Sequence, residues 1–254
     1  SHGPLSSKKY LPLLTSRGCP YPCKFCVIPE TSSRIWRGRD GKNIVDEIIF
    51  LNKKYGVDEF HLEDLNPTVN ENRIIDFCNE IIKNDLKIKW KIVSGTKVES
   101  IKKISTVELM AKSGCKYISI SPESGSAELM KSIDKPFDIN HAIKIIKIMN
   151  KFKIFSQACF IIGFPGESDF DRKLSLKMIK KLVFNGLDEI ALFIVTPIPG
   201  SKIFDKFEGY KSLSELNFSP KWRKDYKKLN TFRIKTYVIF FIYKIIFQPL
   251  KVLK

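Results

Sequence analysis

Residues 16–29, SRGCPYPCKFCVIP, place Cys19, Cys23 and Cys26 in a C-x3-C-x2-C pattern. The chain of 254 residues has only six cysteines, which is too few for a disulfide scaffold, so we expect a reducing, cytoplasmic setting. In that setting a tight cysteine group more often binds a metal or acts in catalysis. Three thiolates on one loop form a sulfur-rich site that selects zinc or an iron–sulfur cluster.

Zinc and an iron–sulfur cluster differ in the fourth ligand that they need. A structural zinc site takes four protein ligands, but the sequence has no second C-x2-C pair and no suitably spaced histidine, since His61 and His141 are isolated. A four-iron four-sulfur cluster held by three cysteines leaves one iron open to a small molecule. The missing fourth cysteine therefore favours a cluster with an open iron.

On both sides of this loop, short apolar runs rich in β-branched residues alternate with longer amphipathic segments. Strands are predicted at residues 10–16, 58–64, 87–95, 115–121, 154–164 and 188–200, and helices at 42–56, 71–85, 106–114, 139–152 and 170–186. This alternation is typical of βα units around a parallel sheet. Six repeats predict an α/β fold, a partial (β/α)6 TIM-like barrel short of the usual eight repeats, followed by a basic, apolar C-terminal extension.

Chemically distinctive residues follow the predicted strands. The cysteine loop follows the first strand, and the later segments are HLED (61–64), SPESGS (121–126), GFPGES (163–168) and TPIPGS (196–201). In parallel sheets of this kind, functional residues collect at the carboxyl ends of the strands. We therefore expect these segments to converge on one face, as an enzyme built on this scaffold requires.

The cysteine loop, with Phe25 before its last cysteine, resembles the signature of radical S-adenosylmethionine (SAM) enzymes. The segments WRGRD, HLEDLNPT, SPESGS, IIGFPGES and TPIPGS follow in order along the chain. Together, residues 11–204 resemble the subgroup whose radical domain often follows a cobalamin-binding domain. The resemblance implies a radical SAM enzyme, and a cobalamin-dependent reaction would need a cobalamin-binding domain that this chain does not contain.

The resemblance also implies the cofactors and the reaction. Cys19, Cys23 and Cys26 would hold a four-iron four-sulfur cluster whose fourth iron is chelated by SAM. An electron from a reductant such as flavodoxin or ferredoxin would cleave SAM to methionine and a 5′-deoxyadenosyl radical, which abstracts hydrogen from an unactivated carbon. The substrate would be a small molecule or a lipid, and no catalytic side chain is identified.

Seven residues are implied to bind SAM by their places in the family motifs. They are Phe25, Val27, Glu63, Asp64, Glu123, Gly163 and Gly166. Phe25 and the backbone near Val27 would lie at the adenine, which the glycines would let the chain approach closely. Glu123 would take the ribose hydroxyls through its paired acceptors. Glu63 and Asp64 would contact the methionine amine.

Several charged residues keep a structural alternative. Asp64 could instead cap the following helix. Arg37 and Arg39 could bind the SAM carboxylate or an anionic substrate, or form a solvated basic turn. Glu167 is interpreted as a charge at a helix start, where the helix dipole favours it. Lys131 and Lys135 are interpreted as surface lysines, with contact to the cofactor as the alternative.

We expect three parts in the sequence. Residues 1–9 would be a linker from a further N-terminal domain, 10–205 the radical SAM partial barrel, and 206–254 the extension. Residues 221–254 carry ten Lys or Arg and one Asp, a large share of the net charge of +17. Their apolar run is too short to span a bilayer. The segment is expected either at a membrane surface or as an element that covers the barrel edge.

Three functions remain open at this point. Within radical SAM chemistry, the outcome is either cobalamin-dependent methyl transfer or hydrogen abstraction followed by rearrangement, cyclisation or oxidation. A tRNA-modifying radical SAM enzyme is the second alternative, although no appended RNA-binding module is visible. A non-catalytic metal-binding scaffold for nucleic acid is the third, and it leaves the SAM motifs unexplained.

Overall fold

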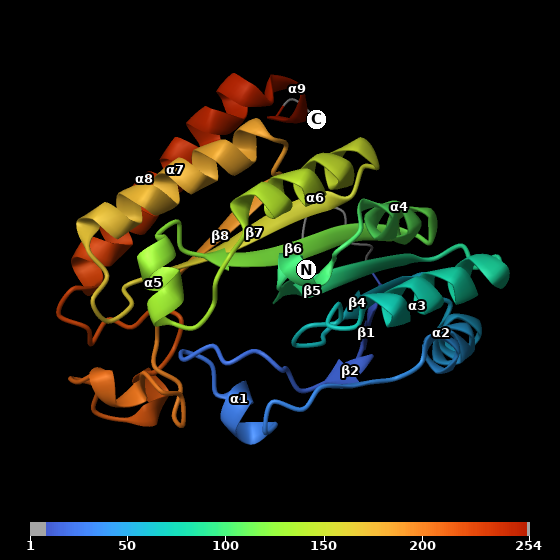
Figure 1. Ribbon diagram of the computed structural model, residues 1–254, viewed down its shortest axis with the longest axis horizontal. Helices are drawn as coiled ribbons and strands as arrows, with labels where there is room; N and C mark the ends of the chain where they lie inside the picture. Colours follow the sequence, from blue (N-terminus) through green and yellow to red (C-terminus); the bar gives the residue numbers. More distant parts are fainter. Residues whose placement is uncertain (1–8, 253–254) are drawn as a thin grey trace. The chain divides into compact units, whose positions relative to one another are not determined.

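The computed structural model describes residues 9–252, and Figure 1 shows its ribbon. Six strands form one sheet in the order β1-β4-β5-β6-β7-β8. Their bounds are Leu11–Leu13 (β1), Glu59–Leu62 (β4), Lys89–Thr96 (β5), Cys115–Glu123 (β6), Phe155–Ile162 (β7) and Glu189–Ile194 (β8). The pairs β1 with β4, β4 with β5 and β5 with β6 are parallel. The α/β class and the six strands of the predicted partial barrel are confirmed.

The helices between these strands begin and end close to the predicted positions. They are α2 (Gly41–Tyr55), α3 (Glu71–Lys83), α4 (Ile104–Lys112), α6 (Ile139–Lys151) and α7 (Asp169–Phe184). Local signals set the ends of α2: the Asp40 side chain accepts a hydrogen bond from the Asn43 amide at 2.7 Å, and Gly56 ends α2 with a φ of 63°. The sequence therefore determines these helices through caps as well as periodicity.

Several elements were not delimited from the sequence. They are α1 (Ile28–Thr31), α5 (Ala127–Ser132), α8 (Tyr226–Phe247), α9 (Pro249–Val252) and the antiparallel pair β2 (Ser16–Arg17) and β3 (Arg37–Gly38). Most of these segments have two to six residues, which is too short for an apolar period to appear. In the long helix α8, basic and apolar residues are not segregated onto opposite sides, so its sequence shows no clear amphipathic pattern.

The chain forms two compact units. The first unit contains the described residues up to Cys19, with 35–121 and 140–157, and the second contains 20–34, 122–139 and the described residues from 158 onward. In the first unit, Trp90 and Phe77 are fully buried with ring centroids 5.3 Å apart. The limits predicted at 10–205 and 206–254 stay a prediction, and residues 1–8 of the predicted linker lie outside the described residues.

The core of the second unit lies beside the cysteine loop. It consists of Leu129, Met130, Ile133, Phe164, Val195 and Ile203, with Phe25 packed against it. The Lys24 amide donates to the Ile133 carbonyl at 3.1 Å, which ties the loop to the segment after α5. The second unit therefore positions the loop residues from Pro20 onward against its own apolar core.

Helix α8 packs within the second unit against α7 and β8, and Figure 1 shows it beside α7. The Leu192 amide of β8 donates to the Tyr237 hydroxyl at 2.9 Å. Lys244 Nζ donates to Gln248 Oε1 at 2.6 Å and to the Leu187 carbonyl at 3.3 Å. Among the described residues, no helix is long and apolar enough to cross a membrane.

Candidate active site

The three motif cysteines are partly exposed, as Cys159 on β7 also is, whereas Cys78 and Cys115 are buried. Cys19 belongs to the first unit, and Cys23 and Cys26 belong to the second. Cys78, by contrast, is fully buried, and burial raises the pKa of its thiol to about 12. Because the thiolate is the form that binds metal, the accessible motif cysteines have the chemistry that an iron–sulfur cluster needs.

The cysteine loop turns tightly in the second unit. The Cys26 amide donates to the Cys23 carbonyl at 3.1 Å, and the Ile28 amide donates to Cys26 Sγ at 3.4 Å. Val27 then caps α1, where its carbonyl accepts from the Glu30 amide at 3.1 Å. In the described part of the chain, no three His, Cys, Asp or Glu side chains form a preassembled metal site. The fit to a cluster thus rests on the type and accessibility of the donors.

Phe25 of the cysteine loop contacts both an aromatic ring and a lysine of the second unit. Its ring centroid is 5.5 Å from that of Phe164 in an edge-on arrangement, and Lys135 Nζ is 5.7 Å from its centroid. Aromatic rings attract a cation through their electron-rich faces. One ring therefore connects the cysteine loop, the apolar core and a buried charge.

Glu123 and Lys135 form a buried ion pair in the second unit. Lys135 Nζ donates to Glu123 Oε1, and both side chains are buried. Burial opposes the charge of Lys135, but attraction to Glu123 and Cys23 outweighs it and raises the pKa of Lys135. Glu123 ends β6 with a φ of 57°, a left-handed conformation that is uncommon for a residue with a side chain.

The interpretation of Lys135 as a surface lysine is wrong. Its amide donates to the Met130 carbonyl at 2.9 Å, and Asp134 takes a φ of 53°, so the chain turns back at the end of α5. This turn carries Lys135 to Glu123, whereas Lys131 stays exposed. The ion pair between Glu123 and Lys135 is not visible in the sequence, because no local pattern shows which of Lys131 and Lys135 is buried.

Gly163 and Gly166 both have a left-handed backbone, but only Gly163 is closely surrounded. A Cβ at Gly163, whose φ is 84°, would lie 2.6 Å from Leu229 Cδ1, while nothing lies within 4 Å of one at Gly166. Arg223, a residue that the sequence did not single out, donates to the Gly163 and Val195 carbonyls at 2.9 Å each. Arg223 therefore fixes the chain where β7 and β8 end.

Glu167 was predicted only as a charge at a helix start, but its side chain also accepts hydrogen bonds within the second unit. Its Oε2 accepts from the Gly163 amide at 2.5 Å and from Arg172 Nη1 at 2.9 Å. Burial raises the pKa of Glu167 despite these partners. Ser168, not Glu167, caps α7, so Glu167 holds the GFPGES turn closed.

Asp64 is buried in the first unit and does not cap α3, a role that Asn70 fills. Asp64 Oδ1 accepts from the Thr15 amide at 2.7 Å, and Oδ2 accepts from Thr15 Oγ1 at 2.6 Å and from the Ser16 hydroxyl. These partners directly precede the cysteine loop in the sequence. The alternative of a helix cap is therefore wrong, and Asp64 anchors the start of the loop.

Glu63, partly exposed, lines a cavity of 700 Å³ in the first unit together with Arg17, Arg37 and Arg39. Arg39 is held by structural partners: its Nη1 lies 2.6 Å from Glu47 Oε2 and donates to the Leu14 carbonyl at 3.0 Å. The structure thus places Glu63 on a cavity lined by three arginines and two glutamates, and it gives Arg39 a structural role.

Comparison with known proteins identifies the family. The family model described as Radical SAM superfamily matches residues 13–179. An uncharacterized methyltransferase of Pyrococcus horikoshii is 30% identical, over 84% of this chain and 44% of its own length. An anaerobic magnesium-protoporphyrin IX monomethyl ester cyclase of Cereibacter sphaeroides is 30% identical, over 80% of this chain and 32% of its own length.

A solved structure shows the same fold. The radical SAM methyltransferase TsrM from Kitasatospora setae, with cobalamin and a 4Fe-4S cluster bound, has a TM-score of 0.67 at 17% identity, over 77% of this chain and 38% of that one. The chain thus spans less than half the length of these relatives. Because the family match covers more than half of the chain and contains all three motif cysteines, the chain belongs to the radical SAM superfamily.

Proposed function

We propose that this chain is the radical domain of an enzyme that cleaves SAM reductively and removes hydrogen from an unactivated carbon. The observation that carries the proposal is the set of three partly exposed thiols, Cys19, Cys23 and Cys26, inside the family match. These cysteines would hold a four-iron four-sulfur cluster, which when bound supplies the electron for SAM cleavage. The chain itself binds SAM and shields the reaction from water.

The second unit supports most of the proposed SAM site. Glu123 would accept the ribose hydroxyls, and the hydrogen bond from the buried Lys135 holds its carboxylate in place. Phe25 and Val27 are to face the adenine, with the left-handed Gly163 and Gly166 shaping the neighbouring turn. The contact between Lys135 and the Phe25 ring supports this grouping, because it links the proposed ribose and adenine residues.

The first unit supplies the proposed contact to the methionine amine. Glu63 is partly exposed on a cavity, so its carboxylate is accessible to an ammonium group. Asp64 accepts three hydrogen bonds from Thr15 and Ser16 and would act mainly by fixing the loop that carries Cys19. Arg37 on the same cavity is a candidate partner for the SAM carboxylate.

The reaction that follows hydrogen abstraction has two candidates. One relative is named a methyltransferase and another a cyclase, at the same 30% identity. We propose cobalamin-dependent methyl transfer, with cobalamin bound outside this chain, or an oxidation or cyclisation. The substrate is a small molecule or a lipid, and the electron donor is a flavodoxin or ferredoxin. The alternative to a small molecule or a lipid is a tRNA substrate.

A peripheral position at the cytoplasmic membrane surface is a further part of the proposal. Helix α8 exposes Ile234, Val238, Phe241 and Ile245 in positions three or four apart, which share one side of a helix. The lysines of residues 221–254 would attract anionic headgroups. Sedimentation with phosphatidylglycerol vesicles but not phosphatidylcholine vesicles is expected, and no sedimentation with either would refute this position.

The enzymatic proposal is tested by assaying 5′-deoxyadenosine. The protein is reconstituted with iron and sulfide under anaerobic conditions and incubated with SAM and dithionite. Production of 5′-deoxyadenosine is expected from the wild type and not from Cys23→Ala, while Cys78→Ala, which changes a core cysteine, controls for a general effect of cysteine loss. Protein that carries the cluster and forms no 5′-deoxyadenosine would count against the proposal.

A further inference from the structure

The C-terminal extension, residues 206–254, reaches the ends of β7 and β8 through Arg223. The Arg223 guanidinium donates from Nη2 to the Gly163 carbonyl and from Nη1 to the Val195 carbonyl, at 2.9 Å each. Gly163 directly follows β7 and Val195 directly follows β8, and these two strands are neighbours in the sheet. One side chain of the extension therefore bridges the ends of two adjacent strands.

The Arg223 guanidinium is also held by residues of the extension itself. Its Nε donates to Asp225 Oδ1 at 2.9 Å and its Nη2 to Asp225 Oδ2 at 2.8 Å, and the hydrogen bonding lowers the pKa of Asp225. The guanidinium lies 5.1 Å from the centroid of the Phe207 ring, and the Arg223 side chain is only 8% exposed. A two-point contact of arginine with a carboxylate fixes the plane of the guanidinium. Arg223 is therefore held in one orientation.

The extension encloses the peptide of Gly163 on two sides. The Gly163 carbonyl accepts from Arg223, while its amide donates to Glu167 Oε2 at 2.5 Å. A Cβ at Gly163 would lie 2.6 Å from Leu229 Cδ1 and 3.0 Å from Arg223 Nη2. Leu229 is buried on α8 and thus also belongs to the extension. The extension therefore fixes this peptide together with the GFPGES turn.

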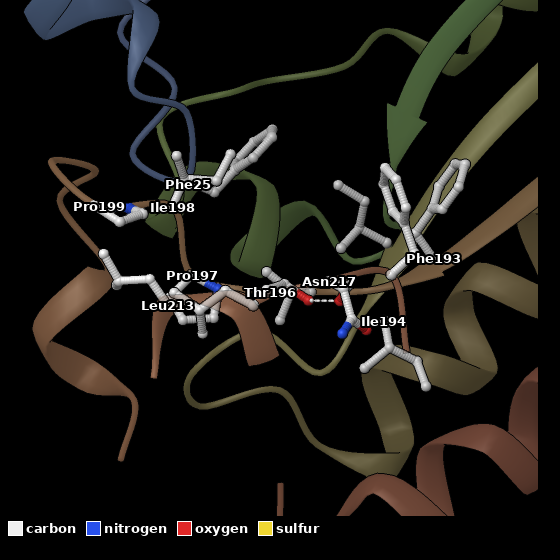
Figure 2. A pocket seen from close by; sticks show the side chains of 13 residues that line it. Phe25, Phe193, Ile194, Thr196, Pro197, Ile198, Pro199, Leu213 and Asn217 are labelled. Carbon is white, nitrogen blue, oxygen red and sulfur yellow. Dashed lines mark hydrogen bonds between the residues drawn. The ribbon is translucent and has the colours of Figure 1, made fainter. Parts of the chain in front are cut away.

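The segment that carries Arg223 has a second connection to the end of β8. Thr196 Oγ1, one residue after Val195, donates to the Asn217 carbonyl of the extension at 2.8 Å, as Figure 2 shows. Trp222, which precedes Arg223, donates from Nε1 to the Glu215 carbonyl at 3.0 Å. These bonds order residues 215–222 against one another and against the strand end. Arg223 thus extends from a loop that is itself fixed.

We infer that Arg223 is a positioning residue for SAM, and that the C-terminal extension is through it a part of the apparatus that sets SAM affinity. The inference rests on the proposed function, in which the turn at Gly163 faces the adenine. Arg223 acts through the peptide that it holds, so its effect is confined to the adenosine part of the ligand. The extension thereby has a role in cofactor binding in addition to the proposed position at a membrane surface.

The test compares three ligands by equilibrium dialysis with the reconstituted protein. SAM and 5′-methylthioadenosine both contain adenosine, whereas methionine does not. Arg223→Met is expected to raise the Kd values for SAM and 5′-methylthioadenosine at least about tenfold, equivalent to about 1.4 kcal/mol, and to leave the Kd for methionine unchanged. Arg223→Lys keeps the charge but not the planar pair of donors, so it should recover part of the affinity.

The matched control is Arg233→Met, an identical change elsewhere in the extension. Arg233 donates to Asn230 Oδ1, on its own helix, at 2.6 Å, so the Kd values of this variant should equal those of the wild type. Urea denaturation shows whether each variant is folded. If Arg223→Met does not fold, Arg223→Lys decides the test through the same rise in the Kd for SAM with no change in the Kd for methionine.

Two results would overturn the inference. One is an unchanged Kd for SAM in the folded Arg223 variants, and the other is a Kd for methionine that rises as much as the Kd for SAM, which a general structural defect would produce. In both cases the wild type still binds SAM and forms 5′-deoxyadenosine, so the proposed function stands. A wild type that carries the cluster but binds no SAM would instead refute the proposed function and the inference with it.

Discussion

Asp64 and Glu123 are two buried carboxylates near the carboxyl ends of β4 and β6, but their surroundings differ. Asp64, in the first unit, is satisfied by the backbone and hydroxyl groups of Thr15 and Ser16. Glu123, in the second, is paired with a buried lysine and has a left-handed backbone. Asp64 is hydrogen-bonded to Thr15 and Ser16 and has the buried Arg73 guanidinium nearby, which donates to Thr15 Oγ1 at 3.0 Å, so this network fixes a loop. A carboxylate paired directly with a buried lysine on a strained backbone is typical of a functional site.

The largest expected effect comes from breaking the ion pair of the second unit. Lys135→Met leaves the Glu123 carboxylate buried without its cation and should lower the free energy of unfolding by about 3–5 kcal/mol. Urea denaturation measures this loss. Lys131→Met, at an exposed position on α5, is the matched control and should change little. A double variant, Glu123→Gln with Lys135→Met, should recover part of the stability; equal loss in single and double variants would contradict the pairing.

A smaller loss is expected at the anchor of the first unit. Asp64→Asn keeps the shape of the side chain but replaces one accepting oxygen by a donor that faces hydroxyl or amide donors. The free energy of unfolding should fall by about 2 kcal/mol in urea denaturation, as charged hydrogen bonds are lost. Glu63→Gln, at the partly exposed neighbour, serves as control. A loss at Glu63→Gln as large as that at Asp64→Asn would show that Asp64 is no anchor.

The next effect concerns SAM binding, in which Glu123 is proposed to take part directly. Glu123→Gln removes a charged acceptor proposed for the ribose hydroxyls and should raise the Kd for SAM about tenfold, or about 1.4 kcal/mol. Equilibrium dialysis of the reconstituted protein measures the Kd. Glu128→Gln, on the neighbouring helix α5, provides a second acidic position for comparison. An unchanged Kd for SAM in Glu123→Gln would contradict the proposed contact between Glu123 and the ribose hydroxyls.

The smallest effect concerns Lys244, a buried lysine whose Nζ donates to the Leu187 carbonyl and to Gln248 Oε1. Burial lowers the pKa of Lys244 to about 8, below the value near 10.4 of an unfolded chain. Because the unfolded state binds more protons between these values, the free energy of unfolding should rise with pH from about 8 to 10, by about 1 kcal/mol after solvent screening. Urea denaturation across this range should show the rise in the wild type and a flatter profile in Lys244→Met. Identical profiles would contradict the lowered pKa.

Sequence analysis predicted most of the framework because periodicity and caps are local signals. The strands and the helices α2, α3, α4, α6 and α7 follow patterns of burial that a linear sequence displays. The pairs that define the site join distant positions instead: Asp64 with Thr15, Glu123 with Lys135, and Arg223 with Gly163. No local pattern encodes these contacts, so the roles of Lys135 and Arg223 became visible only in the folded chain.

The central claim is that Cys19, Cys23 and Cys26 hold a cluster to which SAM binds directly. The most direct measurement is the electron paramagnetic resonance spectrum of the reconstituted, dithionite-reduced protein before and after addition of SAM. We expect the spectrum to change with SAM in the wild type and in Cys78→Ala, and the cluster signal to be lost in Cys23→Ala. A signal that persists in Cys23→Ala, or one that SAM leaves unchanged in the wild type, would contradict the claim.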